Sequence, residues 1–225
     1  MQNMNLKKVV LVGFLGSAIL GATTVVKAAP QDEILGSTNG LGGTSHGYIK
    51  LTPGDVTVGP VAPVKPTTPK GDTGNAGPLT IDNVAPLLFD THKLEGKEQV
   101  YTSSVVGSNV QVTDNRGEEA GWSVQVSQTQ FKDVVDPLKI LKGAKLTLPV
   151  GTIETAGTNV SLQPMVYAVE VNETPVTLIN AAKGSGAGTW VNTFAEKDLK
   201  LTVPAGNRNG EYMSTVTWSL TDAPK

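Results

Sequence analysis

Residues 211–220, EYMSTVTWSL, determine how the rest of the chain is interpreted, because apolar and polar side chains alternate along them. Successive side chains on a β-strand point to opposite faces, so every second residue shares a face. One face would carry Tyr212, Ser214, Val216, Trp218 and Leu220. Burying an indole ring contributes about 2–3 kcal/mol to folding. The alternation therefore predicts a strand whose core face carries Trp218 and Leu220.

A second stretch of the same kind begins 96 residues upstream, at Trp122-Ser123-Val124, and alternates through residue 131. Short alternating segments separated by turn residues recur throughout residues 77–225. This spacing is typical of all-β proteins. We therefore predict an all-β domain, namely a two-sheet β-sandwich of Greek-key type.

Two local predictions accompany this fold class. Leu199–Val203 alternates before a loop that contains Asn209 and Gly210, so we expect it to form a closing hairpin with the last strand, beside Trp218. Helix is expected only as a short piece within residues 131–142, because Pro137 interrupts any longer helix there.

The N-terminal region has the composition of a secretory signal peptide. Two lysines precede an apolar stretch over residues 9–20, and small residues follow at Ala28 and Ala29. A membrane anchor needs about 20 mostly apolar residues, so we predict a signal peptide over residues 1–28. Residues 29–76 are rich in Pro and Gly and show no periodicity, which predicts an extended arm or linker. The domain would then cover residues 77–225.

Charge argues against one class of partner, and cysteine content limits how the domain can be stabilised. Removing residues 1–28 leaves 15 basic residues against 20 acidic ones, a net charge of −5. No cluster of Lys and Arg is present to bind phosphates, so we expect no nucleic-acid partner. The chain has no cysteine, so a hydrophobic core must hold the exported domain together without disulfides.

Three groups of residues give the sequence a resemblance to a known family. The first is the run from Gly77 to Val84, GPLTIDNV, with the aromatic Phe89 after it. The second is Asp114-Asn115-Arg116-Gly117 followed by Gly121-Trp122-Ser123-Val124, and the third is Trp218-Ser219-Leu220. The chain resembles the WxL-domain proteins, a family of surface proteins of Gram-positive bacteria. The first motif departs from the family pattern by having Val124 in place of Leu.

The resemblance implies a function that composition alone does not show. WxL-domain proteins attach non-covalently to the cell wall with peptidoglycan as the ligand, and they are thought to assemble with other surface-anchored proteins. We accordingly expect a secreted, wall-associated protein whose mature chain has no transmembrane span. Its partner would be peptidoglycan or another wall polymer. The alternative is a structural protein that assembles with other surface-anchored proteins instead of binding glycan directly.

Aromatic side chains are the natural candidates for contact with sugars, because their faces stack on pyranose rings. The motif residues Trp122, Ser123, Val124, Trp218, Ser219 and Leu220 are either core or wall-binding. Trp190 follows a Gly-rich loop and is the better candidate for an exposed ligand contact, followed by Tyr101 and Tyr167.

Other constellations that could support catalysis or metal binding are weak. Asp114 and the acidic residues after it lack the order of a calcium loop, so we expect Asp114 to pair with Arg116 or to cap a turn. His46 and His92 are too isolated in the sequence for a zinc site. We expect no metal, no cofactor and no enzymatic activity.

Overall fold

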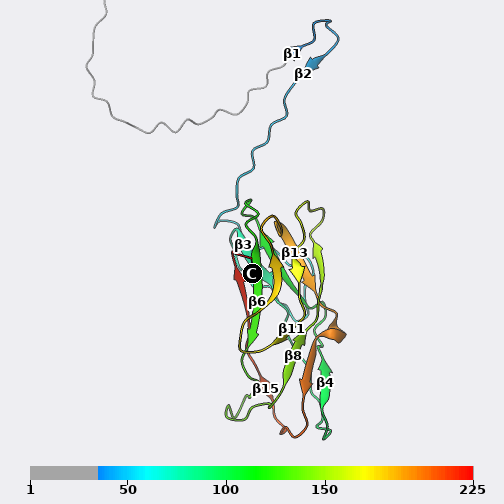
Figure 1. Ribbon diagram of the computed structural model, residues 1–225, viewed down its shortest axis with the longest axis vertical. Coiled ribbons are helices and arrows are strands. Elements are labelled where there is room, and N and C mark those ends of the chain that lie inside the picture. Colours follow the sequence, from blue (N-terminus) through cyan, green and yellow to red (C-terminus); the bar gives the residue numbers. More distant parts are fainter. Residues whose placement is uncertain (1–34, 225) are drawn as a thin grey trace, which may run out of the picture. The chain divides into compact units, whose positions relative to one another are not determined.

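The computed structural model describes residues 35–224, and the predicted signal peptide lies outside them (Figure 1). The described residues fall into two units, with the division between residues 51 and 52. In the described part of the first unit, β1 (Leu35–Gly36) pairs with β2 (Gly43–Thr44). The remaining strands all belong to the second unit.

Hydrogen bonding groups most of these strands into three four-stranded antiparallel sheets, which we name after a central strand. The β6 sheet has the order β10 (Met165–Val166), β12 (Val176–Ala181), β6 (Trp122–Gln128) and β16 (Val216–Thr221). The β8 sheet has the order β11 (Val169–Val171), β8 (Lys145–Leu148), β14 (Lys200–Val203) and β4 (Gln99–Thr102). The β5 sheet has the order β3 (Leu79–Asn83), β5 (Asn109–Asp114), β13 (Gly188–Thr193) and β9 (Thr152–Thr155). A short ribbon joins β15 (Tyr212–Met213) to β7 (Lys132–Asp133).

The all-β class is thus confirmed, while the division into sheets is finer than the two that were expected. The only helix among the described residues is the single 3₁₀ turn η1 (Glu196–Asp198). The sandwich arrangement with Greek-key connections remains a prediction. Within residues 35–224, no helical segment has the length and apolar character that crossing a bilayer would require.

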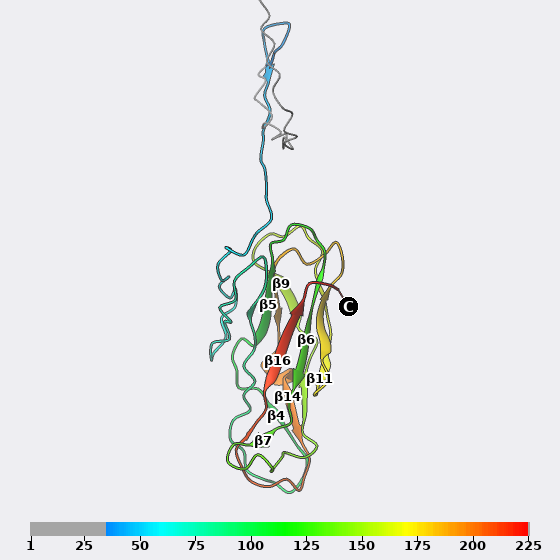
Figure 2. The ribbon, with the colours of Figure 1, turned by 90° about the vertical axis from the view of Figure 1, so that its left-hand side faces the viewer.

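The two tryptophan strands are direct neighbours in the β6 sheet (Figure 2). β16 pairs antiparallel with β6, with Trp218 opposite Val126 and Leu220 opposite Val124. Opposite residues of paired strands point to the same face. Both indole rings therefore lie on one face of this sheet, and that face contributes to the hydrophobic core.

The predicted closing hairpin is wrong. β14, which contains Leu201, pairs with β4 and β8, whereas β16 pairs with β6. Leu199–Val203 is therefore not beside Trp218. Alternation correctly indicated that one face of this segment is buried, since Leu199 and Leu201 are 0% and 6% exposed. The pattern carries no information about which strand will be the neighbour.

The helical piece expected within residues 131–142 is also absent. This stretch contains β7 and a turn, in which the Asp133 carboxylate accepts hydrogen bonds from the backbone N–H groups of Val135 and Asp136, both at 3.0 Å. A side chain that binds nearby backbone N–H groups competes with helical hydrogen bonding. The hydrogen bond from the Asp136 N–H, then the one from Lys139 and the one from the Val135 N–H, lower the pKa of Asp133.

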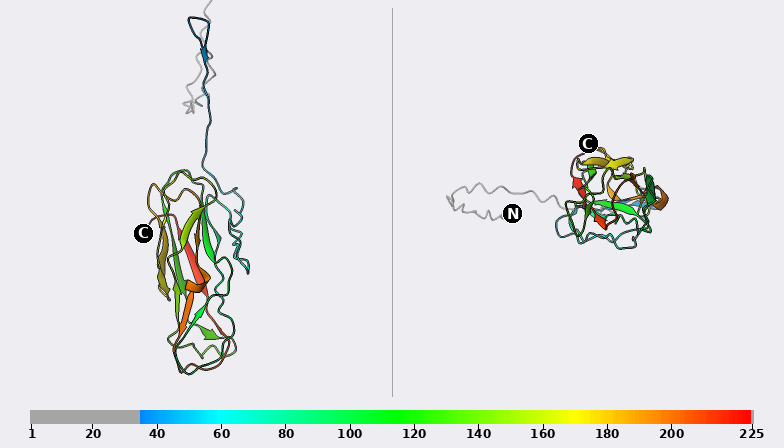
Figure 3. Two further views of the ribbon diagram at one scale, coloured as in Figure 1. Left: turned by 90° about the vertical axis from the view of Figure 1, so that its right-hand side faces the viewer. Right: turned by 90° about the horizontal axis from the view of Figure 1, so that it is seen from below.

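The second half of the predicted arm, residues 52–76, is extended but is held against the β5 sheet (Figures 2 and 3). Gln111 of β5 accepts a hydrogen bond from Val64 N at 2.7 Å and donates one to the Ala62 carbonyl at 3.2 Å. Further along, Thr73 N donates to the Asp82 carbonyl at 2.9 Å. The segment therefore covers the outer edge of β3, which would otherwise expose unpaired backbone groups.

Candidate functional site

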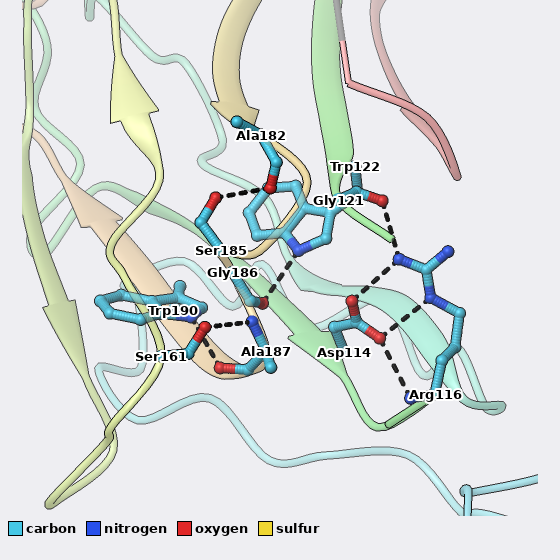
Figure 4. A network of polar contacts seen from close by, with 10 residues as sticks. All are labelled: Asp114, Arg116, Gly121, Trp122, Ser161, Ala182, Ser185, Gly186, Ala187 and Trp190. Carbon is cyan, nitrogen blue, oxygen red and sulfur yellow. Dashed lines mark hydrogen bonds and ion pairs between the residues drawn. The ribbon is translucent and has the colours of Figure 1, made fainter. Parts of the chain in front are cut away.

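The first tryptophan motif is buried. Trp122, Val124 and Ser123 are all 0% exposed. The Trp122 indole Nε1 donates a hydrogen bond to the Gly186 carbonyl at 2.9 Å (Figure 4). A buried indole N–H needs such a partner, because leaving it unpaired costs about 1–3 kcal/mol. Trp122 is therefore a core residue that also fixes a loop.

Trp190 is also buried and also binds this loop, contrary to the expectation that it is exposed. Its side chain is 6% exposed, and its Nε1 donates to the Ala187 carbonyl at 2.9 Å (Figure 4). The Gly-rich loop before Trp190 accepts a hydrogen bond from each of the two indole rings. We call residues 182–188 the glycine loop.

Close packing explains why residue 186 of the glycine loop is a glycine. Gly186 has φ +80°, and a Cβ atom there would lie 2.5 Å from Ala181 Cβ and 2.7 Å from Trp122 Nε1. Gly184 also has a positive φ, of +86°, but a Cβ atom there would meet nothing within 4 Å. Gly186 is thus required by both its backbone conformation and its contact with the indole.

The start of β6 is fixed by an ion pair. Arg116 donates two hydrogen bonds to the Asp114 carboxylate, at 3.0 and 2.8 Å, and one to the Gly121 carbonyl at 2.8 Å (Figure 4). The hydrogen bond with Asp114 is the main cause that raises the pKa of Arg116, and the nearby Asp222 contributes further. The predicted pairing of Asp114 with Arg116 is confirmed, and it is structural.

The second motif has a different environment. β16 is an edge strand, so Trp218 and Leu220 pack against the core but are only partly buried. Both residues line an open cleft of about 550 Å³ between β16 and β3. The cleft is lined by Leu79, Thr80 and Ile81 of β3, by Asn75 and Ala76 of the preceding segment, and by Trp218, Leu220, Thr221 and Asp222.

This cleft combines the two kinds of surface that carbohydrate recognition uses. Trp218, Leu79 and Leu220 supply an aromatic and aliphatic floor. Asp222 supplies an exposed carboxylate, and Asn75 supplies an exposed amide whose Nδ2 also donates to the Ile81 carbonyl at 2.9 Å. Apolar contact with a sugar ring, together with planar polar groups that orient its hydroxyls, is the general design of such sites.

The other aromatic candidates lie outside the cleft. The Tyr101 ring, on β4, is stacked on His92 with 4.1 Å between ring centroids, so one of its faces is already covered. Tyr167 is 36% exposed, and its hydroxyl lies 3.8 Å from the Met165 sulfur. Of the sequence candidates, only Trp218 and Leu220 line the cleft together.

Asn75 and Asp222 were missed by sequence reasoning. Both lie in irregular segments just outside a strand, so no alternating pattern identifies them. Across the described residues 35–224, no three His, Asp or Glu side chains come close enough together to hold a metal ion.

Comparison with known proteins assigns the chain to a family. The family model described as "WxL domain surface cell wall-binding" matches residues 38–224, a range that includes both tryptophan motifs and the cleft. The searches of curated proteins and of solved structures gave no match. Since the match spans well over half of the sequence, the chain belongs to the family of WxL domain surface cell wall-binding proteins.

Proposed function

We propose that this protein is secreted and attaches non-covalently to the bacterial cell wall by binding peptidoglycan in the cleft between β3 and β16. The observation that carries the proposal is the partly buried Trp218, which contributes to the floor of that cleft beside exposed polar groups. Family membership supports the wall as the general target. The cleft is the surface that we assign to wall binding.

The geometry favours a repeating polymer over a small ligand. An open cleft removes less ligand surface from water than a closed pocket does, so each contact is weak. One aromatic contact is worth about 0.5–1.5 kcal/mol, and each net hydrogen bond about 0.5–1.5 kcal/mol. Many equivalent binding sites on one polymer would compensate by raising the local concentration of ligand.

The decisive experiment is sedimentation of the purified chain with isolated walls from which all protein has been stripped. We expect the wild-type chain to sediment with the walls. The Asp222→Ala variant and the double variant Asn75→Ala/Asp222→Ala should remain in solution to a greater extent than the wild type. Glu211→Ala is the matched control, because it removes an exposed carboxylate outside the lining of the cleft. Equal retention of all variants would contradict the assignment to this cleft.

The same experiment separates glycan binding from the alternative, assembly with other surface proteins. Retention by protein-free walls supports direct binding to the polymer. If retention required a second surface protein on the wall, the alternative would be favoured and direct peptidoglycan binding abandoned.

We also propose that attachment involves no bond cleavage. Glycoside hydrolysis usually needs two carboxyl groups on either side of the scissile bond. Among the residues that line the cleft, Asp222 alone carries a carboxylate. We therefore expect a suspension of walls to keep its turbidity after the purified protein is added, and a fall in turbidity would overturn this part of the proposal.

A further inference from the structure

The two threonine hydroxyls of the cleft between β3 and β16 already have partners inside the protein. Thr80 Oγ1 donates a hydrogen bond to Asp82 Oδ1 at 2.6 Å. Thr221 Oγ1 lies 2.7 Å from Ser123 Oγ. The groups that remain for a ligand are therefore the side chains of Asn75, Trp218 and Asp222.

Most of these remaining groups are hydrogen-bond acceptors. Within the described part of the chain, neither the Asp222 carboxylate nor Asn75 Oδ1 accepts a hydrogen bond. Asn75 Nδ2 donates to the Ile81 carbonyl at 2.9 Å, which leaves one of its two N–H groups. The only other free donor is the Trp218 indole N–H, which has no acceptor among residues 35–224. A ligand that matches this set supplies several donors and few acceptors.

Negative charge predominates near Asp222, which carries the only charge among the residues that line the cleft. Arg116 lies nearby, but it is bound to the Asp114 carboxylate at 2.8 Å, and that hydrogen bond is the main cause that raises its pKa. The charges of Asp222 and Glu118 raise the pKa of Arg116 further, so both carboxylates lie near this one guanidinium. Neither of them forms an ion pair within the described residues. The charge of the cleft is thus complementary to that of a cation.

An ammonium group fits each of these features. It has three N–H donors and no acceptor. Its charge strengthens a hydrogen bond to a carboxylate, and an indole face attracts a cation that lies within about 6 Å of the ring centroid. The hydroxyl and acetamido groups of a sugar supply donors without charge, so they gain neither the ion pair nor the contact of a cation with the ring.

We propose that the cleft selects a primary ammonium group of the wall polymer, which binds the Asp222 carboxylate and the Trp218 ring with Asn75 Oδ1 as a further acceptor. This inference rests on the proposed binding of the wall polymer in the cleft, and it adds the chemical group that is recognised. Such a group belongs either to an amino sugar without an N-acyl substituent or to an amino acid of the polymer's peptides.

The first experiment removes the charge from the ligand. Acetic anhydride converts the primary amines of isolated, protein-free walls to uncharged amides, and the purified chain is then sedimented with treated and untreated walls. We expect retention to fall by at least about threefold on acetylated walls, because the ion pair and the contact of the cation with the ring are both lost. Equal retention on both would overturn the inference while leaving wall binding intact. Retention on neither would contradict the proposed function, and this inference with it.

The variant Asp222→Asn tests whether the carboxylate recognises the amine, because it removes one charge and nearly conserves the shape of the side chain. We expect it to bind untreated walls about as well as the wild type binds acetylated ones, and to be insensitive to acetylation. Glu211→Gln is the matched control, since it removes an exposed carboxylate outside the lining of the cleft and should keep the wild-type response. If acetylation lowered the retention of Asp222→Asn as much as that of the wild type, Asp222 would not contact the amine and the proposal would be wrong.

Soluble competitors separate the two sources of the amine. The disaccharide of glucosamine is compared with its N-acetylated form, and Nα-acetyl-lysine amide with the form that is also acetylated at Nε. We expect one of the two amines to release the wild-type chain from untreated walls at a concentration at which its acetylated counterpart does not. Release by the disaccharide assigns the amine to the sugar, and release by the lysine derivative assigns it to the peptides. If neither amine competes better than its acetylated counterpart, the proposal is overturned.

Discussion

Trp122 and Trp218 occupy equivalent places in two paired strands, yet their surroundings differ. Each is followed by a serine and an aliphatic residue, and both rings lie on the core face of the β6 sheet. Trp122 is 0% exposed: β6 is an inner strand of its sheet, and Gly186 of the glycine loop lies against the indole. Trp218 is partly exposed because β16 is an edge strand. The position of the strand in the sheet, rather than the motif, determines whether the tryptophan can contact a ligand.

The contrast extends to what each ring contacts. Trp122 binds the glycine loop and so belongs to a rigid, solvent-excluded network. Trp218 lines a cleft with Asn75 and Asp222. Substitutions at the first motif should therefore change stability, while those at the second should change wall retention more than stability.

The largest effect on stability is expected for Trp122→Ala. It deletes a fully buried ring and leaves the Gly186 carbonyl without its indole donor. Replacing a buried Trp by Ala costs about 3–5 kcal/mol. Urea unfolding followed by circular dichroism would measure this loss. If Trp122→Ala cost no more than Trp218→Ala, the two rings would be equivalent and the contrast between them would fail.

Gly186→Ala should be the next most damaging substitution. The added Cβ would be forced against Ala181 and the Trp122 indole, and an Ala residue at a positive φ is itself strained. We expect a loss of about 2–4 kcal/mol. Gly184→Ala has the same backbone strain in open space and should lose only about 1–2 kcal/mol. The difference in unfolding free energy between the two variants isolates the close contacts with Ala181 and the indole, and equal losses would show that these contacts cost nothing.

Trp218→Ala should have a smaller effect on stability and a larger effect on function. Because the ring is partly buried, we expect a loss of about 1–2 kcal/mol. Retention on protein-free walls should fall at the same time by more than about tenfold, since the aromatic floor of the cleft is removed. Measuring both quantities on the same preparation separates the two roles.

Trp122→Phe serves as the control for that pair of measurements. It should lower stability by about 1–3 kcal/mol through the unpaired Gly186 carbonyl, and retention by the folded protein should stay at the wild-type level. Loss of retention in this variant while it remains folded would assign wall contact to the first motif as well.

The sequence predicted the faces of strands better than their neighbours. Alternation correctly placed Trp122 and Trp218 on strands, and the faces of β14 and β16 agree with the pattern. It gave the wrong neighbour for β14, because pairing across the chain depends on three-dimensional packing that a local pattern does not record.

Exposure was the least predictable property of the site. Trp190 follows a glycine-rich segment, which is usually a mobile surface loop, but that segment folds back onto its indole. Trp218 has a clear core pattern, but the edge position of β16 leaves it partly exposed. The loop before Trp190 is also bound at Gly186 by Trp122, 64 residues earlier, and the exposure of Trp218 depends on which strand pairs with β16. Neither outcome can be deduced from the residues next to each ring.

The serines between the motif residues provide the smallest and most specific test of the contrast. Ser123 is 0% exposed, and its Oγ lies 2.7 Å from Thr221 Oγ1, which links the two tryptophan strands. Ser219 is exposed on β16. Ser123→Ala should therefore cost about 0.5–1.5 kcal/mol, and Ser219→Ala less than about 0.5 kcal/mol. A double-mutant cycle of Ser123→Ala with Thr221→Val should give a coupling energy of about 0.5–1 kcal/mol, since both substitutions break the same hydrogen bond. Zero coupling would mean that the hydroxyl pair does not join the strands, and β16 would then be held to β6 by its backbone ladder and its apolar face alone.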